Sequence, residues 1–431
     1  MAPIRSSNYE TEAFKKEFTI SNAESTLNGC MKLYLNFNSI SNTLKSEYLV
    51  YKVVSSTGNI SEGSFKDIAD NKLLIYDSDF IETNKSITYT LYIWLRYVED
   101  PTINLASLLG TSIDGYVSVN GSDTKESSSC KFDSSKKISY VVTFMNEDDK
   151  TVLESRKVSS GSTLGTLPLD GRYYTKVNAN GTEYTTSSTI NDDVMLYVMM
   201  EPNSFSTDSW YTIAKAAKLN NTSKYKVGDT KEIDMGTYGT HTLRVANTST
   251  PSECSTTGFS QTACGFVLEF ADIITTHKMN NPPTNVGGWP ASSMYTFVNN
   301  DIYNAIPSEI KNAIIDTTVV SGHGSTSGET NFTSIDKLYL LAPKEIYTNF
   351  SSGSDTAKDL TRILDYYTSI GVTTSSYSGA IKKNGTSAST WWLRAANYRS
   401  TSYFLFVYSR GGSAIASADD SSGVAPAFRL G

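Results

Sequence analysis

The sequence predicts a multidomain chain whose first half is all-β and whose last domain is α+β. Short segments of alternating polar and apolar residues, separated by turn residues, fill the first half. Helical spacing of apolar residues begins near Trp210, where helices and strands mix. The length of 431 residues suits two to four domains at roughly 150 residues each, and the 39% hydrophobic content allows packed cores.

Residues 1–130 are predicted to form an all-β sandwich. Segments such as 31–37 and 89–95 alternate, and in the second one Leu, Ile and Leu share a face opposite Thr, Tyr and Trp. Regular short strands with turns between them are typical of sandwiches. The run YTLYIW, followed by a strand at 115–119, resembles the β-sandwich of camelysin- and TasA-type surface fibre proteins.

A second module is predicted at residues 136–203, after a polar linker at 122–137. Two strands flank an acidic turn at 146–150, and a closing strand follows at 192–198. This pattern resembles the β-grasp repeats of Gram-positive surface proteins, of the internalin B-repeat type. The resemblance implies a small β-grasp module that acts as a spacer.

The last domain, residues 204–431, is predicted to be α+β. Apolar spacing and capping residues favour helices at 210–219, 292–300, 307–315 and 355–367. Strands are expected at 240–246 and 263–270.

The last domain also carries four recognisable motifs, which are GGWP at 287–290, DKLYLL at 336–341, WWLR at 391–394 and GVAPAFRL at 423–430. With these motifs it resembles the C-type-lectin-fold modules at the ends of bacterial surface and phage proteins. Some members of that family are variable proteins of diversity-generating retroelements. In those genes a reverse transcriptase rewrites adenines just before the end of the coding sequence. The resemblance implies ligand binding without catalysis, so no enzyme activity is expected.

The segment 395–422 has the amino-acid usage that such rewriting would leave. If only the adenines of AAC or AAT codons vary, the genetic code cannot reach Lys, Glu, Gln, Met or Trp. None of these five residue types occurs between Arg394 and Gly423. A short lectin loop that lacks them by chance is the alternative.

The same segment mixes aromatic residues and arginines with Ser, Gly and Asn, as antibody paratopes do. The residues predicted to face a ligand are Asn397, Tyr398, Arg399, Ser402, Tyr403, Leu405, Tyr408, Arg410, Ser413 and Ile415. The residues predicted to anchor both ends in the core are Trp391, Trp392, Leu393, Arg394, Gly423, Val424, Pro426 and Phe428. Phe404 and Val407 are expected to point inward, which requires a bulge or turn near Phe406.

Composition limits the partners. The net charge is −7 without a basic block, which gives no electrostatic footprint for nucleic acid. No apolar run reaches the roughly 18 residues of a membrane span. Residues 1–7 lack a signal-peptide pattern, and the composition favours a secreted protein whose signal was removed over a cytosolic one. We therefore expect an extracellular or cell-surface protein with an unknown protein or glycan ligand, on a cell, phage or host surface.

Cysteines and histidines give no metal motif. Cys254 and Cys264 could close a local disulfide and Cys30 could pair with Cys130, with four free thiols as the alternative. No CxxC occurs and the three histidines lie far apart, so no metal site and no cofactor are expected.

Several other signals are read as structural. Glu201-Pro202-Asn203 spells the calcium-and-mannose tripeptide of animal C-type lectins, but it precedes the predicted lectin-like domain. The acidic residues at 147–149 and 419–420 are interpreted as solvated turns, and His323 as part of a flexible glycine loop. The fold also houses formylglycine-generating enzymes, whose reactive cysteine pair would lie beyond Cys264, the last cysteine here.

Two alternatives to a ligand-binding protein remain. One is a structural surface-fibre subunit, in which the first domain polymerises by strand donation and the last domain is a passive cap. The other is a phage tail adhesin, which neighbouring genes would distinguish.

Overall fold

The computed structural model describes residues 2–98, 105–108, 112–124, 127, 130, 138–350 and 361–431. The chain divides into two compact units, Met1–Met199 and Met200–Gly431. Strands dominate both units, so the prediction of a mostly β, multidomain chain is confirmed. Among the residues that the structure describes, no helix has the length and apolar character needed to cross a bilayer.

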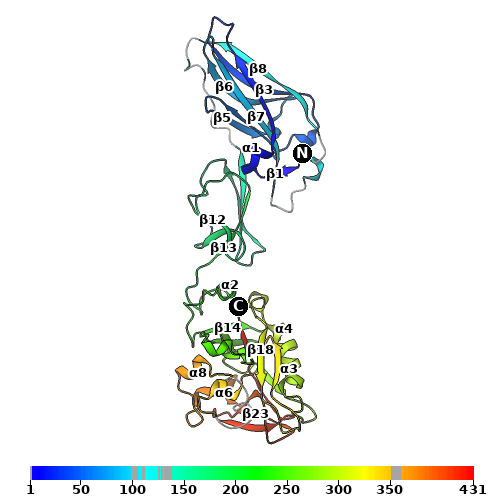
Figure 1. Cartoon of the computed structure of the whole chain (residues 1–431), viewed down its shortest axis with the longest axis vertical. Coiled ribbons are helices and arrows are strands. Elements are labelled where there is room, and N and C mark those ends of the chain that lie inside the picture. Colours follow the sequence, from blue (N-terminus) through cyan, green and yellow to red (C-terminus); the bar gives the residue numbers. More distant parts are fainter. Residues whose placement is uncertain are drawn as a thin grey trace. The chain divides into compact units, whose positions relative to one another are not determined.

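The first part of unit one contains two facing sheets (Figure 1). One sheet has the order β1-β7-β4-β5 with β2 also paired to β7, and the other has the order β6-β3-β8. The strands are β1 (Pro3–Ile4), β2 (Phe14–Ser21), β3 (Gly29–Ser39), β4 (Leu49–Ser55), β5 (Ile60–Ser64), β6 (Lys72–Ile81), β7 (Ser86–Arg96) and β8 (Asp114–Asp123).

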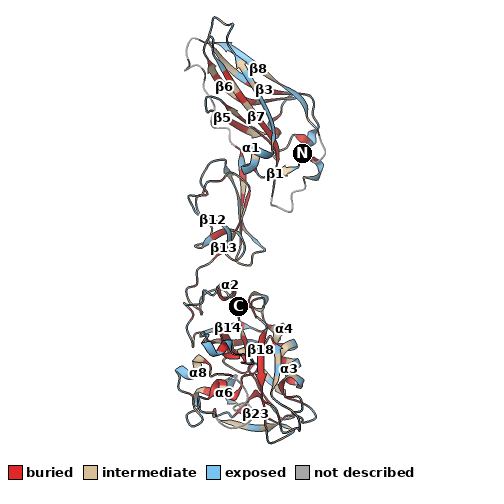
Figure 2. Ribbon diagram, in the orientation of Figure 1, coloured by how far each residue is buried: buried red, intermediate tan, exposed pale blue. Residues whose placement is uncertain are grey.

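The alternation predicted for 89–95 is present in β7. Leu91, Ile93 and Leu95 join the core between the two sheets, where strand residues of both are buried (Figure 2). On the opposite face, Tyr9 of α1 (Tyr9–Glu12) packs its ring 5.6 Å from that of Trp94. Both faces of β7 are therefore covered, which explains why six consecutive residues at its end are buried.

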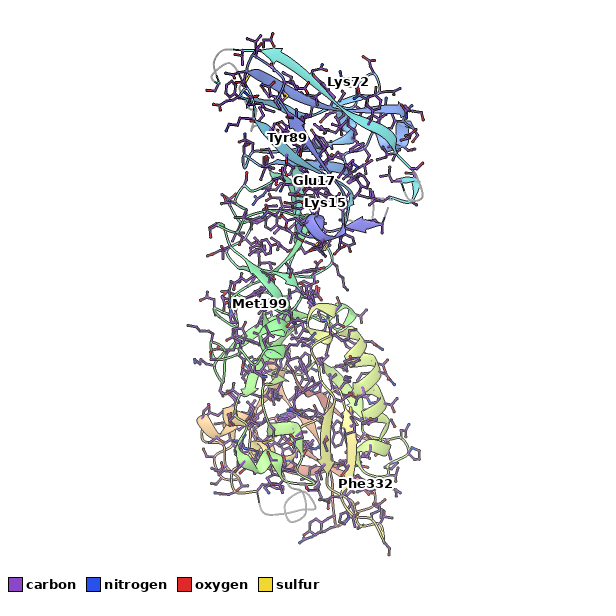
Figure 3. The ribbon with its side chains drawn as sticks, turned by 45° about the horizontal axis from the view of Figure 1, so that its top comes forward. Lys15, Glu17, Lys72, Tyr89, Met199 and Phe332 are labelled. Atoms are coloured by element: carbon purple, nitrogen blue, oxygen red, sulfur yellow. A yellow bond between two sulfur atoms is a disulfide. The ribbon has the colours of Figure 1, made fainter. Side chains whose placement is uncertain are left out.

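Polar groups inside this core are paired. The hydroxyl of Tyr89, labelled in Figure 3, donates to Asp79 Oδ2 at 3.3 Å. The Tyr76 hydroxyl donates to the same oxygen at 3.2 Å. Cys30 of β3 and Cys130 form a disulfide that ties residue 130 to the sandwich.

The rest of unit one is a five-stranded sheet with the order β10-β9-β13-β11-β12. Its strands are β9 (Ser139–Met145), β10 (Val152–Ser159), β11 (Arg172–Lys176), β12 (Asn180–Tyr184) and β13 (Val194–Met199). β13 runs parallel to β9, while the other pairs are antiparallel. The acidic residues after β9 form a turn, in which the Asp148 carboxylate accepts hydrogen bonds from the backbone N–H groups of Lys150 and Thr151.

Arg96 joins this sheet to the sandwich. Its Nε lies 3.1 Å from Asp193 Oδ2, and its Nη1 donates to the Ser139 carbonyl at 2.6 Å. Its guanidinium also lies over the rings of Tyr48 and Tyr140. The two modules predicted separately thus share one compact unit. The predicted linker, 122–137, lies largely outside the described residues.

Unit two contains two larger sheets and two hairpins (Figure 1). The sheet orders are β14-β15-β16-β26 and β17-β25-β22-β23-β24, and the hairpins are β18-β19 and β20-β21. The strands are β14 (Thr230–Asp234), β15 (Thr240–Asn247), β16 (Val267–Phe270), β17 (Thr275–Lys278), β18 (Thr317–Ser321), β19 (Phe332–Asp336), β20 (Lys382–Asn384), β21 (Ser387–Ser389), β22 (Trp391–Ala396), β23 (Tyr403–Val407), β24 (Ser413–Ser417), β25 (Ser421–Val424) and β26 (Ala427–Arg429).

The described helices of unit two are short. They are α2 (Trp210–Lys218), α3 (Ser293–Phe297), α4 (Tyr303–Ala305), α5 (Ser308–Lys311), α6 (Pro343–Ile346) and α8 (Asp365–Ser369). The Ser209 hydroxyl caps α2, close to the predicted start. A π-helical turn, Val298–Ile302, joins α3 to α4, so the helix predicted at 292–300 continues to Ala305.

Two helix predictions differ from the structure. The helix predicted at 307–315 ends at Lys311, because Ala313, Ile314 and Ile315 form backbone contacts with the last three residues of the chain instead. The helix predicted at 355–367 falls partly outside the described residues, and within them α8 begins at Asp365.

Candidate functional site

The segment 395–422 lies between two buried strands, β22 and β25, that are neighbours in one sheet. All of the predicted anchors are buried, as expected, and these are Trp391, Trp392, Leu393, Arg394, Gly423, Val424, Pro426 and Phe428. The indole N–H of Trp391 donates to the Ala380 carbonyl, and that of Trp392 donates to the His277 carbonyl. Both ends of the segment are therefore fixed by packing and by satisfied polar groups.

Arg394 pairs inside the protein, as predicted. Its Nη1 lies 2.6 Å from Glu345 Oε2 and its Nη2 lies 2.7 Å from Glu345 Oε1, and neither side chain is exposed. The remaining donors reach the carbonyls of Val320 and Leu340. This bidentate pair links β22 to α6, and the further bonds of Arg394 reach β18 and the segment that follows β19.

The Glu345 carboxylate is saturated with donors. Besides Arg394, it accepts hydrogen bonds from the hydroxyls of Thr262 and Thr361 and from the backbone N–H of Ala342. A buried ion pair is tolerated only when such bonds offset the loss of hydration. Glu345 had no signal in the sequence, because nothing in the local pattern of Pro343–Ile346 indicates its distant partners.

A second buried charge cluster joins the β14-β15-β16-β26 sheet to the β20-β21 hairpin. Glu269 of β16 contacts Arg244 of β15 at 2.7 Å and Lys382 of β20 at 2.9 Å, and the Tyr367 hydroxyl donates to it. Burial alone would raise the pKa of Glu269. The charges of Arg244 and Lys382 and their hydrogen bonds outweigh it and lower that pKa to about 2.

The loop before β23 is held through its backbone. Asn285 is fully buried, and its side-chain Nδ2 donates to the carbonyls of Ser400 and Tyr403 at 2.9 and 2.8 Å. Its backbone N–H donates to the Thr401 carbonyl, and Ser325 N–H also donates to Ser400. Asn285 is not among the predicted site residues, although it lies two residues before the GGWP motif.

The remainder of the segment is held in the same way. Ser402 and Ala418 are joined by a backbone hydrogen bond, and the Ala418 carbonyl accepts one from Asn280 N–H. The Tyr347 hydroxyl donates to the Gly411 carbonyl at 2.6 Å. All of these bonds end on main-chain carbonyls, so they do not depend on which side chains the segment carries.

Large side chains of the segment face solvent. Tyr398, Tyr403 and Tyr408 expose 38%, 40% and 40% of their surface, and Ile415 exposes 50%. Arg399 and Arg410 are exposed as well.

Each arginine lies over the ring of a neighbouring tyrosine, Arg399 at 5.0 Å from Tyr398 and Arg410 at 5.2 Å from Tyr408. We call these six exposed residues the exposed surface set, and they are Tyr398, Arg399, Tyr403, Tyr408, Arg410 and Ile415. Ser402 and Ser413 are half-buried.

Two residues predicted to face a ligand are buried, and for them the prediction is wrong. Leu405 exposes 5% and belongs to the core, because side chains on both faces of β23 are buried from Phe404 to Val407. Asn397 exposes 8%, and its Oδ1 accepts the backbone N–H of Arg399, so it shapes the loop.

A bulge or turn is predicted near Phe406, and the irregularity lies opposite Phe404–Phe406 on the partner strand rather than in β23 itself. The register between β23 and β24 is continuous, and the irregularity lies in β22, between Trp392 and Ala396. Phe404 and Val407 are buried, as expected. Phe406 lies between Trp392 and the exposed Tyr408, with ring centroids 6.1 and 4.8 Å away, and so connects the core to the surface.

Three other acidic residues, Asp336, Asp419 and Asp420, accept hydrogen bonds from groups within the protein. Asp419 and Asp420 accept hydrogen bonds from Ser417 and form a turn. Asp336 Oδ2 accepts the indole N–H of Trp289, and burial raises the pKa of Asp336 to about 6. The described residues contain no group of three or more His, Cys, Asp or Glu that could hold a metal ion.

Residues 266–431 match the family model of a domain of unknown function, DUF6273. The matched residues run from the start of β16 to the end of the chain and include the anchors and the segment between them. Comparisons with curated proteins and with solved structures gave no match.

We expect Arg394→Met to lower the free energy of unfolding by about 3–5 kcal/mol, because it leaves Glu345 buried without its counter-charge. The matched control, Arg410→Met on the surface, should change it by less than about 0.5 kcal/mol. Denaturant unfolding of the full chain, followed by tryptophan fluorescence, measures both. Equal effects of the two changes would contradict the central role of the Arg394–Glu345 pair.

Proposed function

We propose that unit two is a C-type-lectin-fold domain that binds a ligand through the exposed surface set. One observation carries the proposal. The scaffold holds the segment 395–422 by main-chain hydrogen bonds, while tyrosines and arginines of the same segment face solvent. Tyr and Arg are the residue types that dominate binding energy in protein interfaces.

The proposal includes rewriting of this segment by a diversity-generating retroelement. A surface that varies needs a backbone whose conformation survives changes of side chain, and bonds that end on carbonyls supply this property. The absence of Lys, Glu, Gln, Met and Trp between Arg394 and Gly423 supports the same idea. We expect a near-repeat of this coding segment close to the gene, with adenines where the two copies differ. If sequencing shows no such repeat, the rewriting hypothesis is wrong, and the ligand-binding hypothesis is unaffected.

We place the protein outside the cell, on a bacterial or phage surface, with unit one as a stalk. The disulfides Cys30–Cys130 and Cys254–Cys264 support an oxidising compartment. The proposed mechanism is recognition without catalysis. The ligand is a protein or glycan on another surface, and a phage tail adhesin is one form of the same function.

Replacing Tyr403, Tyr408 and Arg410 together by alanine should abolish ligand binding and leave the fold intact. Each of these exposed side chains should contribute about 2 kcal/mol to binding when it is central in the interface, or about 30-fold in affinity. The measurement is a glycan and surface-protein array probed with the full chain.

Ile335→Ala is the matched control, since Ile335 exposes 58% but lies on β19, outside the segment. It should bind like the wild type. If the triple variant unfolds, these side chains serve the core, and if it binds normally, the surface lies elsewhere.

A structural fibre subunit is the second candidate, favoured by an apolar cleft in the sandwich. The cleft measures about 770 Å³ and is lined by residues of β2 and β8 among others. Among the described residues, β2 pairs only with β7 and β8 only with β3. Phe14 and Tyr116 line the cleft and are more than half exposed. Free strand edges beside an apolar cleft can accept a strand from another copy.

This candidate predicts filaments of the full chain in negative-stain electron microscopy. Val119→Lys, which puts a charge in the cleft, should abolish them. Val152→Lys, at an exposed valine of β10, should not. A monodisperse monomer at high protein concentration would argue against the fibre.

A further inference from the structure

Strand β24 is an edge strand that lies inside the segment 395–422. Among the described residues it pairs only with β23, labelled in Figure 1, and β17 forms the opposite edge of the same sheet. Natural edge strands are protected against pairing with other chains by lysine, proline or a bulge. β17 ends at Lys278, whereas β24 has none of these features, and its register with β23 is continuous. The edge of β24 therefore lacks the usual protection against another strand.

The backbone groups of β24 point alternately toward β23 and toward the free edge. The N–H of Ala418 donates to the Ser402 carbonyl, so this pair of residues is a hydrogen-bonded one. In an antiparallel pair of strands, only every second residue bonds to the partner strand. The N–H and C=O groups that point away from β23 therefore belong to Ser413, Ile415 and Ser417.

The turn that follows β24 occupies one of these outward positions. Asp420 Oδ2 accepts the N–H of Ser417 at 3.2 Å, and the Ser417 carbonyl accepts the N–H of Asp420. A carbonyl has two lone pairs, so the one on Ser417 can accept a second donor. Within the described part of the chain, the outward groups of Ser413 and Ile415 have no partner.

The sequence around β24 is self-complementary. Residues 413–417 read SAIAS, which is the same in both directions from Ile415. Arg410 and Asp420 lie at equal separations before and after Ile415, in the turns at the two ends of the strand. Neither of them takes part in an ion pair with another described residue. Two such strands placed antiparallel would bring Arg410 of each copy to the end that carries Asp420 of the other.

We propose that the protein forms a two-fold symmetric dimer in which the β24 edges of two copies pair antiparallel about Ile415. The Ile415 N–H of each copy donates to the Ile415 carbonyl of the other. The Ser413 N–H of each copy donates to the Ser417 carbonyl of the other. A two-fold interface uses the same surface on both copies, so the assembly closes at the dimer and does not extend into a filament.

Pairing would join the sheets of the two copies into one. Tyr403 lies opposite Ser417 in the ladder, two residues from the pair that contains Ile415, so it shares a face with Ile415. The joined sheet would thus carry two copies of Tyr403 on one face, while Arg410 and Ile415 are partly covered. Two linked sites raise the affinity for a repetitive ligand. This consequence depends on the proposed ligand-binding function, whereas the dimer itself does not.

Sedimentation equilibrium of the full chain, over a wide range of protein concentrations, tests the dimer. Stable interfaces bury about 1,200–2,000 Å² in total, and one short strand from each copy supplies less, so we expect a weak, concentration-dependent dimer. Arg410→Glu and Asp420→Lys should each weaken it by about 10-fold or more, because each puts like charges together at both ends of the paired strands.

An equal mixture of these two variants should dimerise again. In a mixed dimer, opposite charges meet at both ends of the paired strands, which only the antiparallel arrangement about Ile415 provides. Val119→Lys is the control, because it changes the cleft of the sandwich and leaves β24 intact. It should dimerise like the wild type, which separates this dimer from the fibre described above.

Ile415→Pro tests the backbone pairing without altering Asp420, and it replaces Asp420→Lys if that variant does not fold. It removes an N–H that points away from β23, so no hydrogen bond within the chain is lost and the Tm should be retained. It should abolish the dimer. The proposal is overturned if the wild type is a monomer at every concentration, if both charge variants dimerise like the wild type, or if their mixture stays monomeric. Ligand binding by such a monomer would leave the proposed function intact.

Discussion

The buried pair of Arg394 and Glu345 is the constraint on which unit two depends. Two ions without exposure are stable only because every donor and acceptor around them is used, including two threonine hydroxyls and three main-chain groups. The pair joins β22, at the centre of its sheet, to α6 and to the β18–β19 hairpin. The chain that leaves β22 toward the exposed surface therefore starts from a fixed point, and the return through β25 is fixed by apolar packing.

Between these fixed ends, main-chain hydrogen bonds set the conformation of the segment, and exposed side chains set its surface chemistry. Carbonyl groups of Ser400, Thr401, Tyr403 and Gly411 receive the scaffold's hydrogen bonds, whereas the tyrosine and arginine side chains remain in solvent. Asn285 is central to this arrangement, because its buried amide donates to two carbonyls and so leaves the loop few alternative backbone conformations.

The sequence predicted the burial of the anchors and the exposure of Tyr398, Tyr403 and Tyr408, because apolar blocks and isolated aromatic residues differ in local pattern. It failed for Leu405 and Asn397. Alternation assumes that one face of a strand is exposed, but β23 is covered on both faces, and this depends on strands and helices distant in sequence. The helix at 307–315 was overestimated for a similar reason, since the end of the chain captures its last residues.

The sequence by itself determined the β-rich, multidomain character, the position of the turns and the two blocks that bury the ends of the segment 395–422. These features follow from composition and short-range periodicity, which act within a few residues. Only the tertiary structure decided that Glu345 meets Arg394, that Asn285 meets Ser400 and Tyr403, and which strand is covered on both faces. Those outcomes join residues between 49 and 118 positions apart, and no local pattern encodes which distant groups will share a buried site.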